Sequence, residues 1–315
     1  MKLSELKQSF SIAIVGPTAS GKSGLALELA QQVNGEIVSC DSLQVYKNFN
    51  IGTAKPSLAE RALVPHHLID LVSWQETFDA ARYRTLALEC IAEIHQRQRL
   101  PILVGGTGLY FRALCGQQFH DLPHDESLRE QLNTLPTDTL YQKLQDLDPQ
   151  RATEVHPHDR FRLIRACEIN LLTGRRLASL SAEKSTDGFH PTLTVLCNPA
   201  RDILHDKIRA RTAAMLKAGL VGEVETLLAA GCTEKQKPMQ AIGYRQVCDS
   251  LHGRLPEHEL LEKIVIATRQ YARKQLIWFR KVPVDLQLSE PYAVPEAIVQ
   301  IKNQFSIASQ KDTDA

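Results

Sequence analysis

The sequence predicts an α/β fold in which a parallel sheet is flanked by helices and interrupted by a helical insertion. Three observations support this prediction. Short apolar runs alternate with segments of helical periodicity as far as Gly105, a glycine-rich loop joins the first run to the first helix, and the pattern becomes polar and proline-rich near residue 118. Because parallel strands are buried by helices on both faces, the alternation indicates a doubly covered sheet.

The expected strands are short and apolar, and the first two flank a helix. That helix follows Lys22 and is closed by Gly35, because its apolar residues recur at a spacing of three to four. A second helix is expected from about Thr77, as its N-cap, to His95. The predicted strands are residues 12–15, 36–40, 100–104 and 193–196.

The second half of the chain is predicted to be mostly helical. One helix should end at Gly174, and the tail after about Ser306 is expected to be disordered because it is polar. The predicted helices are residues 160–173, 202–230, 240–250 and 257–281. The pattern divides the chain into an α/β core, residues 1–118 and 188–315, and a helical insertion domain, residues 119–187. A polar linker near 181–190 lies at the boundary between them.

Composition limits the class of protein. The chain has 315 residues, a formal net charge of +1 and seven cysteines. The cysteines are scattered without a C-x-x-C pair, which suits a reducing cytosol better than a disulfide framework or a zinc site. The N-terminal segment lacks the apolar stretch of a secretory signal, and no run is long enough to span a bilayer. We expect a soluble, cytoplasmic, monomeric protein.

The loop from Gly16 to Ser23 matches the phosphate-binding pattern G-x-x-x-x-G-K-S. Its glycines allow the backbone N–H groups to surround an anion, and the helix that follows adds its positive end. Lys22 supplies a full charge, and the Ser23 hydroxyl is a candidate ligand for Mg²⁺. A chance lysine after a glycine turn is the alternative, but the flanking strand and helix make it a poor one.

The acidic residue expected of a nucleotide-hydrolysing enzyme is missing from the natural place. The strand at 100–104 ends in Gly105-Gly106-Thr107-Gly108, without an acid. Asp41 instead follows the strand at 36–40 and should reach the carboxyl-end edge of the sheet, where ligands of α/β proteins bind. From its position alone, Asp41 is a metal ligand, a general base or a turn-capping residue.

Eight motifs then occur in order along the chain, and together they resemble one family. They are GPTASGKS at 16–23, DSLQVY at 41–46, IGTAKP at 51–56, VPHHLID at 64–70, GGTGLY at 105–110, RLIRACE at 162–168, AIGYR at 241–245 and RKQLIWFR at 273–280. These motifs resemble those of the tRNA dimethylallyltransferases (tRNA isopentenyltransferases, the IPP transferase family). The resemblance covers about residues 11–281 and implies a P-loop NTPase-like core with an inserted tRNA-binding domain.

The resemblance implies transfer of a dimethylallyl group from dimethylallyl diphosphate to N6 of the adenosine at tRNA position 37, beside the anticodon, with release of diphosphate. It makes Asp41 the general base and adds Thr18 and Arg211 as catalytic residues. The cradle for the diphosphate, with Mg²⁺ on Ser23, would consist of Gly16, Thr18, Ala19, Ser20, Gly21, Lys22, Ser23 and Arg211. Without the resemblance, Arg211 is an ordinary helix charge.

The resemblance also implies a surface for the anticodon stem-loop, from which the target base must be extruded into a pocket. Arg269, Arg273 and Arg280 lie four and seven residues apart and share one helix face. A modest loss of affinity with added salt is expected. The expected RNA contacts are Asp41, Ser42, Leu43, Gln44, Thr107, Phe161, Arg162, Leu163, Ile164, Arg165, Gly243, Tyr244, Arg245, Arg273, Lys274, Gln275, Trp278 and Arg280.

Three other functions share some of these features. A P-loop kinase for a small molecule or nucleoside would bind ATP in the same loop, but it leaves the insertion without a role. A prenyltransferase acting on free adenylate needs no insertion to hold RNA. An RNA-binding protein without activity would not need Lys22 and Asp41. The pair His66-His67 is expected to be structural, because neighbours on an extended segment point opposite ways, and Glu168 is expected to form a helix salt bridge.

Overall fold

The computed structural model describes residues 10–116, 123–176, 188–289 and 293–313, and it divides the chain into two compact units. Residues 1–115 and 189–315 form the larger unit, and residues 116–188 form the smaller one. The predicted linker near 181–190 lies largely outside the described residues. In the described part of the chain, no helix is long and apolar enough to cross a membrane.

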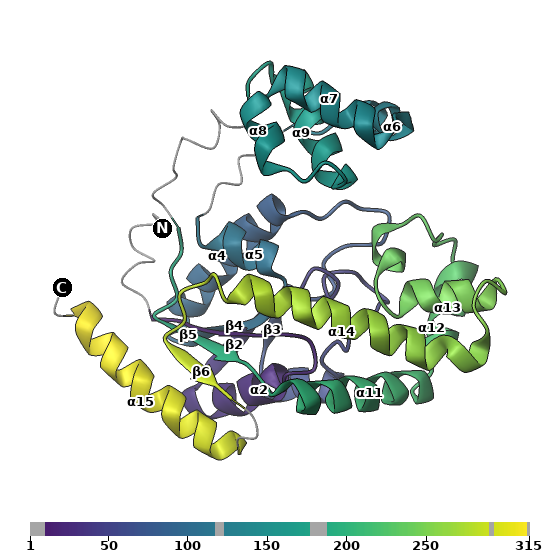
Figure 1. Cartoon of the computed structure of the whole chain (residues 1–315). Coiled ribbons are helices and arrows are strands. Elements are labelled where there is room, and N and C mark those ends of the chain that lie inside the picture. The colour runs from purple at the N-terminus through teal and green to yellow at the C-terminus, as the bar shows by residue number, and fades with distance from the viewer. Residues whose placement is uncertain (1–9, 117–122, 177–187, 290–292, 314–315) are drawn as a thin grey trace. The chain divides into compact units, whose positions relative to one another are not determined.

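A six-stranded parallel sheet forms the centre of the larger unit (Figure 1). The strand order is β3-β2-β4-β1-β5-β6, so β1 is paired on its two sides by β4 and β5. The four predicted strands are all present. The bounds are β1 Ile12–Val15, β2 Gly35–Cys40, β3 His66–His67, β4 Leu100–Gly105, β5 Leu193–Cys197 and β6 Leu286–Leu288.

Helices cover both faces of this sheet, as the apolar strands require. Figure 1 shows α2 and α15 on one side and α4 and α5 on the other. The core between α2, α15 and the sheet contains Ile14, Leu29 and Ile301, all fully buried. The helices are α2 Lys22–Val33, α3 Leu58–Leu63, α4 Ala80–Gln96, α5 Gly108–Leu114, α11 Arg201–Lys217, α12 Leu220–Ala229, α13 Tyr244–Leu251, α14 Leu260–Phe279 and α15 Val294–Thr313.

Several predicted helix bounds are wrong for local reasons. Helix α4 begins at Ala80, because the Asp79 side chain accepts a hydrogen bond from the Arg82 N–H and caps it, whereas Thr77 lies before the helix. The single helix predicted over 202–230 is two helices, because Gly219 takes a left-handed conformation between them (φ 99°). Segment 240–250 likewise becomes helical only from Tyr244.

The edges of the sheet and the C-terminal tail also differ from the prediction. Strands β3 and β6 are too short to give a periodic signal, and each is added to an edge of the sheet by pairing. Helix α15 continues past Ser306 to Thr313, where the sequence predicts no helix. Residues 294–305 of this helix include buried core residues such as Ile298, and extending a formed helix costs little.

The smaller unit is helical, as expected. It contains α6 Glu126–Thr134, α7 Thr137–Leu147, α8 Pro149–Glu154 and α9 Arg160–Thr173. Its own hydrophobic core includes Leu140 and Leu144, which are fully buried. Glu168 is buried in this unit, and its carboxylate accepts hydrogen bonds from Arg129 at 3.1 Å and Arg165 at 2.6 Å. The predicted salt-bridge role of Glu168 is therefore confirmed.

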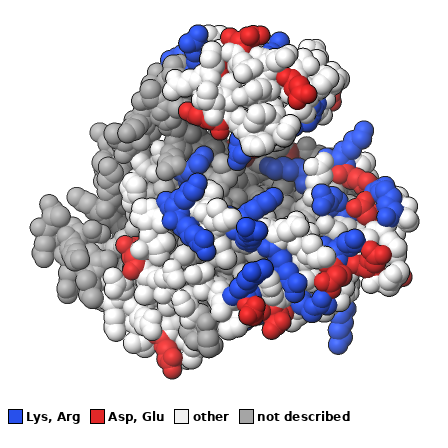
Figure 2. Space-filling model, viewed as in Figure 1, with Lys and Arg blue, Asp and Glu red and all other residues white. Residues whose placement is uncertain are grey.

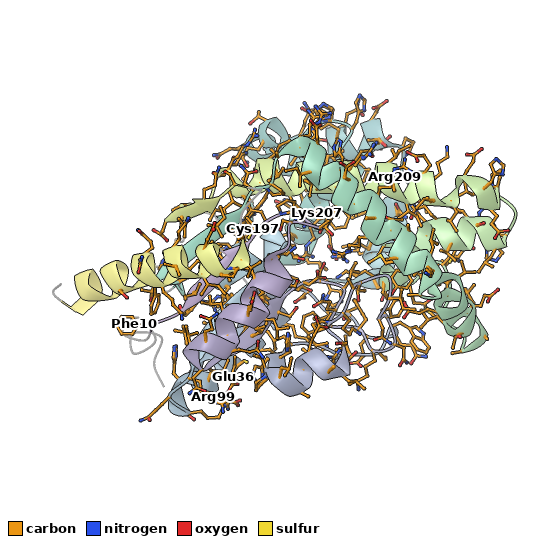
Figure 3. The ribbon with its side chains drawn as sticks, turned by 90° about the horizontal axis from the view of Figure 1, so that it is seen from below. Phe10, Glu36, Arg99, Cys197, Lys207 and Arg209 are labelled. Atoms are coloured by element: carbon orange, nitrogen blue, oxygen red, sulfur yellow. The ribbon has the colours of Figure 1, made fainter. Side chains whose placement is uncertain are left out.

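A polar cluster lies at the amino ends of the strands, away from the carboxyl-end edge. Glu36 on β2 pairs with His67 at 2.6 Å and Arg97 at 2.8 Å, and Arg99 lies beside it (Figure 3). Although burial opposes it, the hydrogen bonds from Arg97 and His67 lower the pKa of Glu36. His66 contacts the Val64 carbonyl instead. Both histidines thus hold the sheet edge together, which agrees with the structural role predicted for them.

Candidate active site

A cavity of about 1080 Å³ opens at the carboxyl ends of β1, β2 and β4 in the larger unit. This is where ligands bind in parallel α/β sheets, and the volume suits more than one small group. The lining residues come from the loops after these three strands, from the first turn of α2, from helices α11 and α14 and from the segment before α13. They include Thr18, Lys22, Ser23, Asp41, Gln44, Gly106, Arg211, Tyr271 and Gln275.

The phosphate-binding loop follows β1 and needs its glycines. Gly16 has φ 154°, and a methyl group there would lie 2.5 Å from the Cys197 carbonyl oxygen of β5. Gly21 has φ 82° and precedes α2. Thr18, Ala19, Lys22 and Ser23 line the cavity. Of the predicted cradle, Ser20 is different: its side chain is buried, and its N–H donates to the Pro17 carbonyl at 3.3 Å.

Lys22 is half-buried at the start of α2, and its Nζ donates to the Pro17 carbonyl at 3.0 Å. Burial and then the positive charge of Arg211 lower the pKa of Lys22 to about 8. Burial also lowers the pKa of Arg211, while the Asp41 carboxylate opposes this change. These three side chains, from three separate segments, are therefore close enough to interact electrostatically, and two cations meet at one end of the cavity.

Asp41 directly follows β2 and faces the same cavity. Its Oδ1 accepts hydrogen bonds from the N–H groups of Leu43 at 2.9 Å and Gln44 at 3.4 Å, which fixes the orientation of the carboxylate. Beside it, Thr107 Oγ1 accepts from the Ser42 N–H at 3.1 Å. The turn-capping reading of Asp41 is thus correct locally, and it does not prevent the carboxylate from meeting a ligand.

Gln44 is used inside the protein. Its Oε1 accepts from the Ser39 hydroxyl at 3.0 Å, and its Nε2 donates to the carbonyls of Thr53 and Ala54 at 3.4 and 3.3 Å. Gln44 therefore supports the loop that follows it. Both ends of its amide have partners within the protein, and Gln44 also lines the cavity. The contact of Gln44 with the target base stays a prediction.

Gln275 on α14 joins two turns of the site. Its Oε1 accepts from the Thr18 N–H at 2.8 Å, and its Nε2 donates to the Gly106 carbonyl at 2.8 Å. It is buried, so it holds the phosphate-binding loop against the turn after β4. One turn earlier, Tyr271 lines the cavity, where burial and the Asp41 charge raise the pKa of its hydroxyl.

The basic face predicted on α14 is partly present. Arg273, Lys274 and Arg280 are exposed, and Figure 2 shows lysine and arginine side chains gathered where α14 crosses the surface. Trp278 is half-buried, with its ring edge-on to Phe111 at 6.4 Å. A methyl group on Gly108 would lie 2.3 Å from the Trp278 ring, so this residue packs α14 onto α5.

Two residues predicted to contact RNA have buried side chains. Tyr244 and Leu163 are fully buried, each in the core of its own unit. Gly243 is buried beside Tyr244, whereas Arg245 is exposed. In the smaller unit, Arg165 is committed to Glu168, Ile164 packs against the core, and Phe161 and Arg162 are exposed. The Phe161 and Arg162 side chains both reach the surface, and Arg162 also pairs there with Asp159. The RNA contacts of these two residues stay a prediction.

Sequence reasoning missed several residues that shape the cavity. Lys55 donates to Asp70 at 2.6 Å, and Arg61 donates to the same carboxylate at 2.8 Å. All three line the cavity. Lys55 falls in the IGTAKP motif and Asp70 in the VPHHLID motif, whereas Arg61 lies between the two motifs. The short distance between these residues in the sequence was the only sign that they could form ion pairs. Glu223, described below, lies far from both motifs and gave no signal.

The comparisons with known proteins agree with the resemblance. A family model described as IPP transferase matches residues 44–282. The chain is 43% identical over 276 residues to tRNA dimethylallyltransferase 2 of Geotalea uraniireducens, which covers 86% of this chain and 89% of that protein. It is 41% identical over 284 residues to the tRNA dimethylallyltransferase of Geobacter metallireducens, covering 89% and 92%.

Solved structures show the same likeness. The full-length tRNA isopentenylpyrophosphate transferase of Bacillus halodurans is 35% identical, with a TM-score of 0.72 and coverage of 97% of this chain and 98% of that one. A eukaryotic dimethylallyltransferase acting on tRNA is 30% identical, with a TM-score of 0.80 and coverage of 94% and 79%. The likeness thus extends over both compact units.

Proposed function

The chain belongs to the IPP transferase family, and from this premise we propose that it transfers a dimethylallyl group from dimethylallyl diphosphate to N6 of adenosine 37 in tRNA. The observation that carries the proposal is the meeting of Lys22, Arg211 and Asp41 in one cavity. Two cations suit a diphosphate, and the carboxylate suits the proton of an amine. The kinase alternative gains no support from the comparisons.

The diphosphate would bind at the Lys22 end of the cavity. The N–H groups at the start of α2 have no partner within their helix, which favours an anion there. In the reaction the bond between the prenyl carbon and the diphosphate oxygen breaks, and charge develops on the leaving group. Lys22 and Arg211 would stabilise that charge. Thr18 would orient the diphosphate, and Gln275 would keep Thr18 in place by accepting its N–H.

Asp41 would act as the general base at the other reacting atom. As the new bond between N6 and the prenyl carbon forms, the amine loses a proton, which the carboxylate accepts. The hydrogen bonds to Oδ1 fix the plane of the carboxylate beforehand. Electron pairs therefore move from nitrogen to carbon and from carbon to the leaving oxygen, and the proton ends on Asp41.

A magnesium ion fits the residues present. Magnesium is commonly held by one or two protein oxygens together with substrate phosphates, and the Ser23 hydroxyl follows Lys22 on the exposed first turn of α2. In the described residues, no three histidine, cysteine, aspartate or glutamate side chains gather to hold a metal without substrate. When bound, the ion would neutralise charge on the diphosphate.

We also propose how tRNA is bound. The exposed cations of α14 would contact phosphates of the anticodon stem-loop, and Phe161 and Arg162 of the insertion would add contacts from the smaller unit. The adenine would be extruded to reach Asp41. The enzyme would act as a monomer in the cytoplasm, where its seven free cysteines stay reduced.

The experiment is transfer of labelled dimethylallyl diphosphate to unmodified tRNA, with Mg²⁺ present. We expect label in tRNA with the wild type and a fall of about a hundredfold or more in Asp41→Asn, because the amide keeps the acceptor Oδ1 but cannot take the proton. Asp206→Asn, an exposed aspartate of α11, is the matched control and should leave transfer unchanged.

Each other result has a definite meaning. Unchanged transfer in Asp41→Asn would remove Asp41 as the base while keeping the transferase. No transfer by the wild type, together with turnover of ATP onto a small acceptor, would replace the transferase with the kinase.

A further inference from the structure

A second turn with neighbouring backbone N–H groups lies in the wall of the same cavity. These N–H groups already donate hydrogen bonds to a carboxylate of the protein. Asn50, Ile51 and Gly52 line the cavity, and their N–H groups donate to Glu223 of α12 at 3.0, 2.9 and 3.3 Å. The Tyr244 hydroxyl donates to the same carboxylate at 2.6 Å. Glu223 is more than 170 residues away in the sequence, so tertiary packing alone brings it here.

Tyr244 fits closely against this turn. Its ring is fully buried and lies 5.0 Å from the Phe49 ring between centroids. A methyl group on Gly52 would lie 2.4 Å from the Tyr244 ring. Burial and the neighbouring Glu223 charge raise the pKa of the Tyr244 hydroxyl, which therefore stays a proton donor. Glu223 thus links the two motifs, because its carboxylate accepts hydrogen bonds from Tyr244 of AIGYR and from the Ile51 and Gly52 N–H groups of IGTAKP.

The turn is held from its other side as well. Gln44 donates to the carbonyls of Thr53 and Ala54, and the Thr53 hydroxyl donates to the Phe49 carbonyl at 2.7 Å. Lys55, nearly fully buried, donates to the Tyr46 carbonyl at 2.7 Å. The N–H groups of residues 50–52 and the carbonyls of Thr53 and Ala54 are therefore all paired within the protein, which holds this wall in place on both sides.

The position of the turn decides which ligand it meets. The phosphate-binding loop follows β1, whereas the turn follows Asp41 and leads to β3 at the edge of the sheet beyond β2. Along the sheet, Asp41 at the end of β2 lies between the two. A diphosphate at the β1 end therefore leaves the β3 end, with its turn, to the acceptor that delivers its proton to Asp41.

We propose that Glu223, supported by the Tyr244 hydroxyl, is a positioning residue that fixes the turn at residues 50–55 as the wall of the acceptor-nucleotide subsite. The inference rests on the proposed function. The negatively charged Glu223 carboxylate also accepts hydrogen bonds from the N–H groups that would otherwise attract an anion. The cavity is thus left with one cradle for the diphosphate and one wall for the nucleotide.

The test is a comparison of KM values for tRNA and for dimethylallyl diphosphate in Glu223→Gln. Glutamine keeps the size of the side chain, but its NH₂ group faces donors and cannot accept from them. We expect KM for tRNA to rise about tenfold, with kcat and KM for the diphosphate within about twofold. Glu225→Gln, an exposed glutamate two residues along α12, is the matched control and should match the wild type.

Amide hydrogen exchange gives a readout that does not depend on activity. A peptide covering residues 50–52 should exchange faster in Glu223→Gln than in the wild type or Glu225→Gln, while the peptide covering the phosphate-binding loop stays unchanged. Should Glu223→Gln fail to fold, Tyr244→Phe keeps the buried ring and removes one donor, and we expect KM for tRNA to rise about threefold.

The outcomes separate this inference from the proposed function. No transfer by the wild type defeats the function, whatever the variants do. Transfer by the wild type, with equal changes in both KM values or no change in either, overturns the positioning role of Glu223. Unchanged exchange at residues 50–52 overturns it as well, because the carboxylate would then not hold the turn.

Discussion

The cavity has two turns whose backbone N–H groups are gathered together, and they differ in what faces them. At the phosphate-binding loop, residues 16–23, the cationic side chains of Lys22 and Arg211 line the cavity and make its electrostatic potential more positive. In the turn at residues 50–52, the carboxylate of Glu223 accepts the N–H groups. In the proposed function the first turn binds an external anion, whereas the second carries an internal one.

This difference teaches how one cavity can keep two substrates apart. Two open cradles would compete for a diphosphate, since both offer what an anion needs. In the proposed function, filling one cradle with a side chain leaves a single place for the donor diphosphate and makes the other turn a fixed surface. Each turn is also held by one distant side chain, Gln275 for the first and Glu223 for the second. Substitutions in the two turns should therefore affect the two substrates differently.

Lys22→Met should abolish the function of the open cradle. We expect transfer to fall by about a hundredfold to a thousandfold, because the charge that stabilises the leaving diphosphate is lost. The melting temperature at pH 7 should not fall and should rise slightly, because burial and Arg211 both disfavour the lysine charge. Single-turnover transfer and a thermal melt measure the two effects, and a clearly less stable variant would contradict this account.

Gln275→Ala should loosen the same cradle without removing a charge. The Thr18 N–H and the Gly106 carbonyl both lose their partner, so we expect kcat/KM for the diphosphate to fall about thirtyfold. KM for tRNA should change less. Gln270→Ala, at an exposed position of the same helix, is the control. A loss confined to KM for tRNA would instead favour the direct RNA contact first predicted for Gln275.

Gly52→Ala should disturb the filled turn. The added methyl group would lie 2.4 Å from the Tyr244 ring, so either the ring or the turn must move. We expect KM for tRNA to rise about five- to tenfold and the protein to lose about 1–3 kcal/mol of stability. Gly222→Ala, on α12 with open space around the added methyl, should keep both KM values and be slightly stabilising. Equal behaviour of the two variants would contradict the close fit.

A change of pH between about 7 and 9 should affect binding of the diphosphate at the phosphate-binding loop. Because the pKa of Lys22 is lowered to about 8, its charge is lost from the free enzyme as pH rises through that value. KM for the diphosphate should therefore rise a few-fold between about pH 7 and pH 9, while KM for tRNA is followed in parallel.

The same lowered pKa has a consequence for stability. The unfolded chain, with an ordinary lysine pKa of 10.5, binds more protons than the folded one between about pH 8 and 10.5, so this group makes the protein more stable as pH rises through that window. Thermal melts of the wild type and Lys22→Met across the window measure the contribution, and parallel curves for the two would contradict it.

Much of the fold could be predicted because its signals are local. The strands at 12–15 and 100–104 are continuous apolar runs, and Gly174 ends its helix where expected. The errors had two sources: a cap or a glycine that sets a helix end, as at Asp79 and Gly219, and packing that overrides local preference. Strand β3 has two residues and exists only because β2 offers it an edge, and α15 extends past Ser306 because its earlier turns pack on the core.

The candidate site divides in the same way. By itself the sequence determined the phosphate-binding loop and the place of Asp41, because a loop between a strand and a helix, or a residue at a strand end, is fixed by its neighbours in the chain. Only the tertiary structure showed that Tyr244 is buried, that Gln275 holds the loop, and that Glu223 fills the second turn. Those contacts join residues far apart in the chain, and their geometry depends on how whole helices pack, which no local pattern records.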